Sequence, residues 1–334
     1  NVVVRMPNWL GDLVMAMPAL MQLKRSFSHV AALCPKGLAP VLRASDCVDE
    51  TIPLENAHAF PIKEERLAVA RFRAECGVLF NNSFRDALAL RLCGVRRLFG
   101  TAARGRAVLL ERSIRFPKRK DRELNPPHQA VRNARIAALA GAALWDEAAL
   151  PSFRIGISME EFQRRHGFRP AKPLLILAPG AAYGDAKRWD AEKFRRTALV
   201  WMQEKGGEVV AVGSGSEAPV CEECVRGVSG ARSLAGRTSL EELMLLLAES
   251  DLCIANDSGV MHLAALLGAR GVAIFGSTDP AATSPISKKW LVLYEKQPCS
   301  PCFRRICPLQ TRACFKAIEV KRVLDAAEEL LAQG

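Results

Sequence analysis

Three small polar residues, Asn256, Asp257 and Ser258, interrupt an otherwise apolar region of the sequence. A strand-like segment precedes them and a helix-like segment follows, which predicts a strand-to-helix turn. Ser258 and Gly259 would lie in the first helical turn, whose free N–H groups attract anions such as phosphate. Asp257 would repel a phosphate, so we expect it to cap the helix or to bind sugar hydroxyls. His262, about one turn further on, is more often a packed residue than a catalyst.

Two other loops that follow predicted strands carry groups suited to a nucleotide. In 178–189, small residues precede Lys187, and backbone N–H groups beside a lysine commonly hold phosphate. In 212–217, Gly213 permits close approach of a ligand, and Glu217 can accept hydrogen bonds from ribose hydroxyls. Neither pattern is specific, because turns are rich in glycine and serine in any case and a solvated charge pair also explains Lys187.

Asp12 stands immediately before the apolar segment 13–27 and has two interpretations. The pattern alone favours the N-cap of a helix, a position where aspartate is common. A carboxylate at the carboxyl end of the first strand is also placed where a general base would act. The preceding residue, Gly11, would let the backbone approach a ligand. The loop lacks the full G-x-G-x-x-G pattern, so it does not support a dinucleotide site.

Cysteine spacing singles out the C-terminal part of the chain. Several of the eleven cysteines are scattered among apolar residues, as buried thiols in a reducing compartment are. Four others have the spacing C-x2-C-x4-C-x6-C, which differs from the paired zinc ribbon. They form either a structural zinc site or a group of thiols packed under a loop, and they are Cys299, Cys302, Cys307 and Cys314.

The basic excess of the chain lies in its first half. Residues 1–170 hold 27 Lys and Arg against 16 Asp and Glu, whereas residues 171–334 hold 20 against 19. The excess is densest in 85–122, with 12 basic and three acidic residues. Such a surface is either merely solvated or binds an anionic nucleic acid, phosphorylated sugar or membrane. Only Phe99 and Phe116 could stack on bases there, which argues against nucleic acid.

The elements that position these loops alternate between strand and helix, which is typical of parallel sheets. Strands are predicted at 2–6, 29–34, 76–81, 174–180, 208–214, 251–256 and 271–276. Helices are predicted at 13–27, after the strand 76–81 up to about 92, and at 125–142, 193–207, 239–250 and 318–333. The mixed segment 150–173 joins the two series. We therefore predict two doubly wound domains, 1–160 and 161–334, with ligands outside the carboxyl ends of the strands and in a cleft between the domains.

No apolar run approaches the ~20 residues that a membrane-spanning helix needs. The residues at the start of the sequence also lack the basic and then apolar pattern of a secretory signal. We therefore expect a cytoplasmic protein.

Taken together, the loops resemble those of the bacterial ADP-heptose:lipopolysaccharide heptosyltransferases. The resemblance rests on VVVRMPNWLGDLVMAMPALMQLK at the start and on NDSGVMHLAALLGARGVAIFGSTDP around Asp257. The segments NNSFRDAL, PGAAYGDAKRW and CSPCFRRICPL resemble the second heptosyltransferase of the inner core more than the first. The similar segments span almost the whole chain, in the order found in the family.

The resemblance implies a GT-B architecture, with two Rossmann-like domains facing across a cleft. It implies inverting transfer of heptose from ADP-L-glycero-D-manno-heptose to the heptose of the lipopolysaccharide inner core, without a metal or other cofactor. The N-terminal domain would hold the lipid-linked, anionic acceptor, which agrees with the basic first half. The C-terminal domain would hold the ADP-sugar. We expect a monomer that contacts the cytoplasmic face of the inner membrane peripherally and binds no nucleic acid.

The resemblance also assigns roles to individual residues. Asp12 matches the family's catalytic base, and Lys187 matches the lysine that steadies the departing diphosphate. Donor-binding roles fall on Gly213, Glu217, Asp257, Ser258, Gly259 and His262. Acceptor-binding roles fall on Asn82, Ser83, Arg85 and Arg104. Two alternatives remain open, namely transfer to Kdo-lipid A by an enzyme of the first type, and another GT-B nucleotide-sugar enzyme such as an epimerase.

Overall fold

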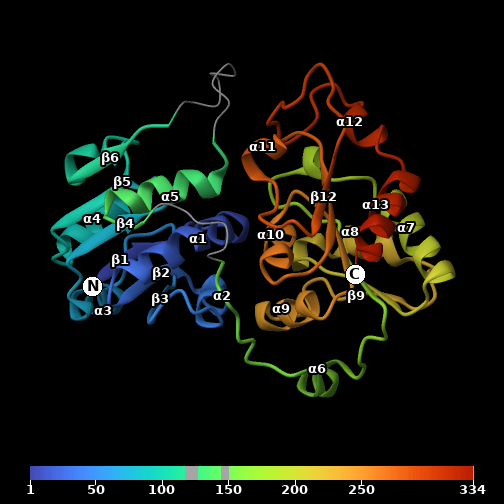
Figure 1. The fold of residues 1–334 in the computed structure, drawn as a ribbon, viewed down its shortest axis with the longest axis horizontal. Helices are drawn as coiled ribbons and strands as arrows, with labels where there is room; N and C mark the ends of the chain where they lie inside the picture. Colours follow the sequence, from blue (N-terminus) through green and yellow to red (C-terminus); the bar gives the residue numbers. More distant parts are fainter. Residues whose placement is uncertain (117–126, 144–149, 334) are drawn as a thin grey trace. The chain divides into compact units, whose positions relative to one another are not determined.

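The computed structural model describes residues 1–116, 127–143 and 150–333 of the chain. The chain divides into two compact units, Asn1–Arg154 and Ile155–Gly334. Each unit is built around one six-stranded parallel sheet with helices packed on it (Figure 1). The predicted architecture of two doubly wound α/β domains is therefore confirmed.

The division between the units differs from the predicted one. We expected the boundary between residues 160 and 161, but both lie inside helix α6 (Met159–His166). Ser158 caps this helix by accepting a hydrogen bond from the Glu161 N–H at 3.2 Å, so the segment is an element of its own. The joining segment was predicted as mixed, and the helix within it belongs to the second unit.

The first unit has the strand order of the usual Rossmann fold. In space its strands run β3-β2-β1-β4-β5-β6, and all neighbours are parallel. Their bounds are β1 (Val2–Arg5), β2 (Val30–Pro35), β3 (Glu50–Leu54), β4 (Cys76–Leu79), β5 (Arg97–Thr101) and β6 (Arg112–Ile114). From β1 the chain adds β2 and β3 on one side, and it then returns to add β4 on the other side of β1. The strand order therefore reverses between β1 and β4, which is the topological switch point.

The helices of the first unit are α1 (Leu10–Ser26), α2 (Ala39–Arg43), α3 (Lys63–Phe72), α4 (Phe84–Leu92) and α5 (Gln129–Leu139). The middle of α1 is buried continuously, because its residues are apolar all round. It lies beside α5 (Figure 1), where the Asn133 side chain donates a hydrogen bond to the Met15 carbonyl at 3.2 Å. This contact holds α1 in place behind the loop that follows β1.

The second unit repeats the same topology. Its strands run β12-β11-β10-β7-β8-β9 in space, which is the Rossmann order when they are numbered within the unit. Their bounds are β7 (Leu174–Ala178), β8 (Glu208–Ala211), β9 (Ala231–Ser233), β10 (Leu252–Asn256), β11 (Gly271–Phe275) and β12 (Trp290–Tyr294). The switch point here lies between β7 and β10.

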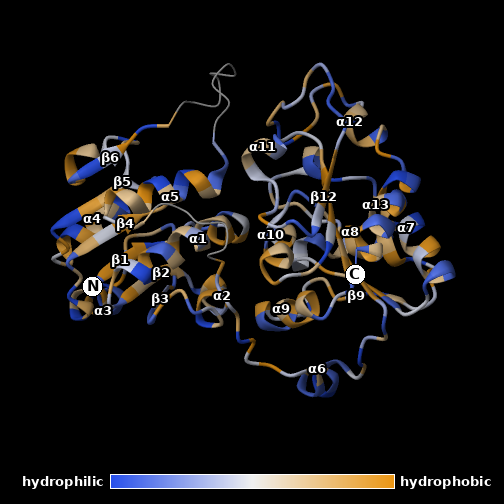
Figure 2. Cartoon of the chain, in the orientation of Figure 1, coloured by the Kyte–Doolittle hydropathy of each residue, from blue (hydrophilic) through white to orange (hydrophobic). Residues whose placement is uncertain are grey.

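Besides α6, the helices of the second unit are α7 (Ala191–Glu204), α8 (Ala218–Val225), α9 (Leu240–Ala248), α10 (Gly259–Leu266), α11 (Pro280–Thr283), α12 (Ala313–Lys316) and α13 (Val320–Ala332). Apolar residues gather in the strands and on the inner sides of the helices (Figure 2). In α13, for example, Val323 and Leu330 belong to this core, whereas Lys321 and Asp325 pair with each other on the exposed side at 2.8 Å.

Five strands were absent from the predicted pattern, and four of them are sheet edges. These four are β3, β6, β9 and β12, and the fifth is β5 beside β6. The edge strands β3, β6 and β9 are short or partly polar, so they lack the apolar run that identifies a central strand, whereas β12 has such a run, WLVLY, and was not predicted. In β3, Pro53 interrupts the run as well, and proline within a sheet is confined to edges and bulges. Part of the basic stretch 85–122 forms β5 and β6, and its residues 117–122 lie outside the described residues.

Candidate functional site

Most of the predicted site residues lie at the two topological switch points, where Rossmann-like sheets bind ligands, whereas Arg104 follows β5 and Gly213 and Glu217 follow β8. In the first unit, Asp12 follows β1, and Asn82, Ser83 and Arg85 follow β4. In the second unit, Lys187 follows β7, and the turn from Asp257 to His262 follows β10. Strands β1 and β4 are direct neighbours, and so are β7 and β10. Each unit therefore presents two of the candidate loops side by side.

Two loops of the second unit meet at the carboxylate of Asp257. The Lys187 ammonium lies 2.5 Å from Asp257 Oδ2, and the Thr278 hydroxyl donates to the same oxygen at 2.6 Å. His262 Nε2 lies 4.0 Å from the other oxygen, Oδ1. The side chain of Asp257 is only 5% exposed and that of Lys187 15% exposed, so this is a largely desolvated ion pair. The ion pair places the Lys187 ammonium beside the turn that precedes α10.

Asn256 connects the end of β10 to the loop that carries Lys187. It is the last residue of β10 and is fully buried. Its side-chain oxygen accepts a hydrogen bond from the Trp189 N–H at 2.9 Å, and its amide group donates to the Pro179 carbonyl at 2.7 Å. One side chain thus fixes both ends of the loop that carries Lys187. Sequence reasoning identified Asn256 only as part of a polar interruption, because its partners lie far away in the chain.

The turn after β10 differs in one detail from the predicted one. Ser258, and not Asp257, is the N-cap of α10, and its hydroxyl accepts a hydrogen bond from the Met261 N–H at 3.4 Å. Gly259 begins the helix, so the predicted helix N-terminus is present. The suggested cap role of Asp257 was wrong, because its carboxylate faces Lys187 and Thr278 instead. His262 is buried within α10, as the apolar pattern predicts.

Glu217 lies close to the loop that follows β7. Its carboxylate accepts hydrogen bonds from the N–H and the hydroxyl of Ser214, both at 2.8 Å, and so closes the turn that begins at Gly213. A Cβ atom at Gly180 would lie 2.1 Å from a Glu217 carboxylate oxygen, so any other residue there would displace the end of the Glu217 side chain. The carboxylate therefore reaches the base of the Lys187 loop.

At the switch point of the first unit, Asp86 is the centre of a buried charge network that the sequence did not reveal. Arg5 Nε lies 2.9 Å from Asp86 Oδ2, with the Arg5 side chain only 1% exposed. Arg85 Nε donates to Asp86 Oδ1 at 3.1 Å, and Arg85 Nη2 donates to the Ala57 carbonyl at 2.9 Å. Burial lowers the pKa of Arg5, and the nearby Asp86 opposes that shift. The network fixes the predicted acceptor residue Arg85 at the start of α4.

Asn82 is held by a second buried arginine. Arg106 Nη2 donates to the Thr101 hydroxyl at 2.7 Å and lies 3.5 Å from the Asn82 side-chain oxygen. Burial lowers the pKa of the Arg106 guanidinium to about 10. The other predicted acceptor residues are placed differently. Ser83 caps α4 by accepting from the Asp86 N–H at 3.2 Å, and Arg104 lies exposed in the turn after β5.

Asp12 lies inside the first turn of α1 and is not its N-cap. The cap position belongs to Trp9, whose side chain makes no capping hydrogen bond. The interpretation of Asp12 as an N-cap was therefore wrong. A carboxylate in the first helical turn is stabilised by the helix dipole. Trp9 is 61% exposed, so a large aromatic surface precedes this carboxylate in the same loop.

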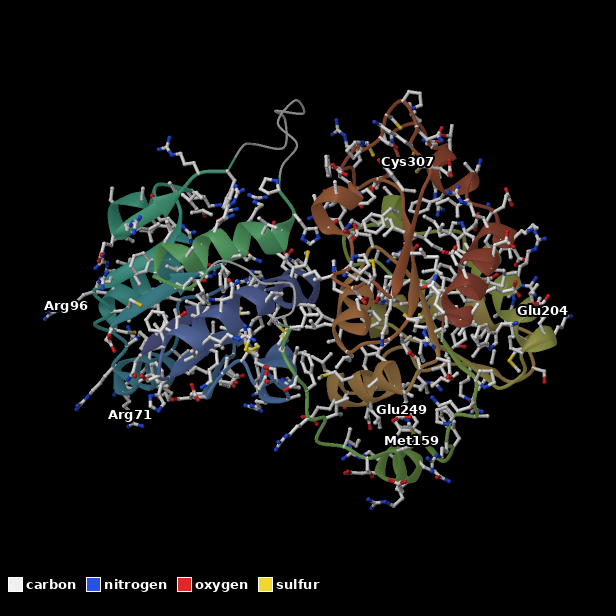
Figure 3. All side chains as sticks on the ribbon, viewed as in Figure 1. Arg71, Arg96, Met159, Glu204, Glu249 and Cys307 are labelled. Atoms are coloured by element: carbon white, nitrogen blue, oxygen red, sulfur yellow. The ribbon has the colours of Figure 1, made fainter. Side chains whose placement is uncertain are left out.

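The four cysteines of the C-terminal part share one cavity of about 380 Å³ with Gly276 and Ser277. Cys307, which Figure 3 labels in the loop before α12, is the exception among them in its chemistry. Backbone N–H groups, first that of Arg312, point at its sulfur and lower the pKa of its thiol. Across the described residues, these cysteines included, no three His, Cys, Asp or Glu side chains are arranged to hold a metal ion. Within the same residues, no helix is both long and apolar enough to cross a membrane.

Comparison with known proteins identifies a family and several relatives. Residues 68–313 match glycosyltransferase family 9 (heptosyltransferase). Lipooligosaccharide heptosyltransferase 2 of Campylobacter jejuni is 28% identical over 99% of this chain and 98% of its own length. Lipopolysaccharide heptosyltransferase 2 of Escherichia coli K12 is 26% identical over 86% of each chain.

Among solved structures, the ADP-heptose lipopolysaccharide heptosyltransferase II of Escherichia coli is similar to this chain, with a TM-score of 0.82. The similarity covers 100% of this chain and 99% of that one, at 24% sequence identity. At this level of identity the structural similarity establishes the shared fold of two Rossmann-like units.

Proposed function

The chain belongs to glycosyltransferase family 9, the heptosyltransferases, and from this we propose that it transfers heptose to the lipopolysaccharide inner core. The donor is ADP-L-glycero-D-manno-heptose, and the acceptor is the heptose already present on the core. The full-length relatives named heptosyltransferase 2 support this choice over transfer to Kdo-lipid A and over an epimerase.

The observation that carries the proposal is the convergence of Lys187, Asp257 and the N-terminus of α10 at the switch point of the second unit. A lysine ammonium and free helix N–H groups together suit a diphosphate. The Asp257 carboxylate holds the lysine in position, and Glu217 lies near enough to the same loop to reach a ribose. We assign backbone contacts with the donor to Gly213, Ser258 and Gly259, and His262 Nε2 lies 4.0 Å from the Asp257 carboxylate at the same turn.

In the proposed reaction, an acceptor hydroxyl oxygen attacks the anomeric carbon of the heptose. The bond from that carbon to the diphosphate breaks, ADP leaves, and the Asp12 carboxylate takes the hydroxyl proton. Negative charge accumulates on the departing diphosphate, where Lys187 and the amides of α10 stabilise it by fixed electrostatics. We propose that no added cofactor is needed, so transfer should continue unchanged in a chelator such as EDTA.

The acceptor belongs to the first unit in this proposal. Arg85 is held after β4 by Asp86, which also pairs with the buried Arg5, and Asn82 is held by the buried Arg106. Together with the exposed Arg104, they offer positive charge and hydrogen bonds to a phosphorylated, acidic oligosaccharide. Because such an acceptor is lipid-linked, we propose that the protein works at the cytoplasmic face of the inner membrane. We also propose that it is a monomer and that it binds no nucleic acid.

A transfer assay with two acceptors tests this proposal. The protein is incubated with ADP-heptose and either Kdo-lipid A or the same core already bearing one heptose. We expect the heptosylated acceptor alone to be extended. Extension of Kdo-lipid A would assign the first heptosyltransferase activity instead. Epimerised ADP-sugar without transfer to either acceptor would identify an epimerase.

A further inference from the structure

The segment 297–312, here called the cysteine loop, packs against the loops after β7 and β11. These two loops carry Lys187 and Thr278, which bond Asp257. The Phe303 N–H donates to the Ser277 carbonyl at 2.7 Å, and Ser277 directly precedes the Thr278 that bonds Asp257. On the other side, the Tyr183 hydroxyl donates to the Phe303 carbonyl at 2.8 Å. The cysteine loop is therefore attached to the site through its own backbone.

Arg305 of the cysteine loop contacts the backbone directly beside Lys187. Its carbonyl accepts a hydrogen bond from the Ala186 N–H at 3.0 Å, one residue before Lys187. Gly184 makes this approach possible, because its φ is +143° and a Cβ there would lie 2.5 Å from the Arg305 carbonyl oxygen. The backbone of Arg305 is thus fixed against the loop that carries the lysine.

The side chains of Arg305 and Lys187 converge on one aromatic ring. The Lys187 ammonium lies 5.3 Å from the centre of the Tyr183 ring, and the Arg305 guanidinium carbon lies 5.4 Å from it. Both distances fall within the range of a cation–π interaction. The two positive charges therefore both lie beside the Tyr183 ring, separated by no more than the sum of these two distances.

The charges of the two residues are balanced differently. Lys187 is paired with Asp257, so together they contribute no net charge. Arg305 is exposed, and among the residues that the structure describes no carboxylate forms an ion pair with it. Arg305 therefore supplies positive charge at this site that no carboxylate neutralises. An exposed arginine can also reorient its fork of N–H donors toward a phosphate, which it binds in bidentate fashion.

We propose that Arg305 binds the diphosphate of the nucleotide-sugar donor, as the second cation of the site beside Lys187. This inference rests on the proposed function, and it assigns the cysteine loop a direct part in donor recognition. It also explains why this loop is anchored through its backbone: the anchor places the Arg305 guanidinium, while the side chain stays free to move onto the ligand.

Binding of ADP and of adenosine, measured by isothermal titration calorimetry, tests the proposal without any transfer reaction. Charge-assisted hydrogen bonds to phosphate are among the strongest in proteins, so we expect Arg305→Ala to weaken ADP binding by about tenfold or more. Adenosine lacks the diphosphate, so its affinity should not change. Arg304→Ala is the matched control, since Arg304 is the adjacent exposed arginine, and it should bind ADP as the wild type does.

A second variant keeps the charge but not the fork. Arg305→Lys should recover part of the lost ADP affinity, since lysine binds phosphate as a point charge. Equal ADP affinity of wild type and Arg305→Ala would overturn the assignment of Arg305 and leave the proposed function intact. A parallel loss of adenosine affinity would overturn it too, because the loss would then reflect the loop and not the diphosphate. A wild-type protein that binds no ADP would contradict the proposed function and this inference together.

Discussion

Asp257 has two partners that bond the same carboxylate oxygen, Lys187 at 2.5 Å and Thr278 at 2.6 Å. The sequence placed Asp257 in the correct turn but could not name these partners, because they come from loops after other strands. It predicted the packing of His262 correctly, since a histidine within an apolar helical segment is normally buried. Local pattern thus identified the residues, and only the parallel sheet brought them together.

Removing Lys187 should affect stability as well as binding. Lys187→Ala leaves the carboxylate of Asp257 buried with Thr278 as its remaining close partner, and an unpaired buried charge costs about 3 kcal/mol. We expect the free energy of unfolding, measured by urea denaturation, to fall by about that amount. The double variant Lys187→Ala with Asp257→Asn should recover most of the loss. If the single variant is as stable as the wild type, the pair is not a desolvated one.

Cys307 should be the most reactive of the cysteines near neutral pH. Backbone N–H groups, first that of Arg312, favour its thiolate and lower its pKa, so the thiolate persists to lower pH than in a free cysteine. Burial raises the pKa of Cys221 to about 12 and holds that thiol protonated. Iodoacetamide at pH 7, followed by peptide mass spectrometry, should label Cys307 first and leave Cys221 unlabelled. Labelling of Cys221 at the same rate would contradict this account, and Cys307→Ser provides the control.

At the scale of elements, Asn256 links the end of β10 to both ends of the Lys187 loop. The alternation of strand and helix predicted the central strands β1, β4, β7 and β10, because their apolar runs are continuous. It did not predict the edge strands β3, β6 and β9, whose shortness or polarity removes that signal, nor β12, although its run WLVLY is apolar. It placed the start of α1 too late, because the helix begins at Leu10 and Asp12 lies inside its first turn.

Asn256→Ala should loosen the Lys187 loop. The substitution leaves the Trp189 N–H and the Pro179 carbonyl buried without their partner, and each unsatisfied group costs about 1–3 kcal/mol. We expect a loss of about 3 kcal/mol in unfolding free energy, together with weaker ADP binding. Ser258→Ala, which removes only a helix cap, is the comparison and should cost about 1 kcal/mol. Similar losses for the two variants would show that Asn256 has no special part in the loop.

At the scale of the whole molecule, the strand orders of both sheets and the family match agree with the predicted architecture. The resemblance rested on several loops in a fixed order, and this is why it identified the family where no single loop did. The charge division between the halves is a property of the sequence, and it agrees with an anionic acceptor on the first unit. The buried networks of Arg5 and Arg106 were beyond sequence reasoning, because arginine is mostly exposed and the sequence does not show which distant partners would allow its burial.

The most direct test of the central claim compares wild type and Asp12→Asn in heptose transfer from ADP-heptose to a core acceptor that ends in heptose. Asn matches Asp in size, so the two proteins should unfold at similar urea concentrations. We expect the wild type to extend the acceptor and Asp12→Asn to lose about 10²–10⁴-fold in rate, the usual contribution of a general base. A wild-type protein that extends no acceptor would contradict the proposed function. An Asp12→Asn variant that keeps most of the rate would refute the role of Asp12 as the base.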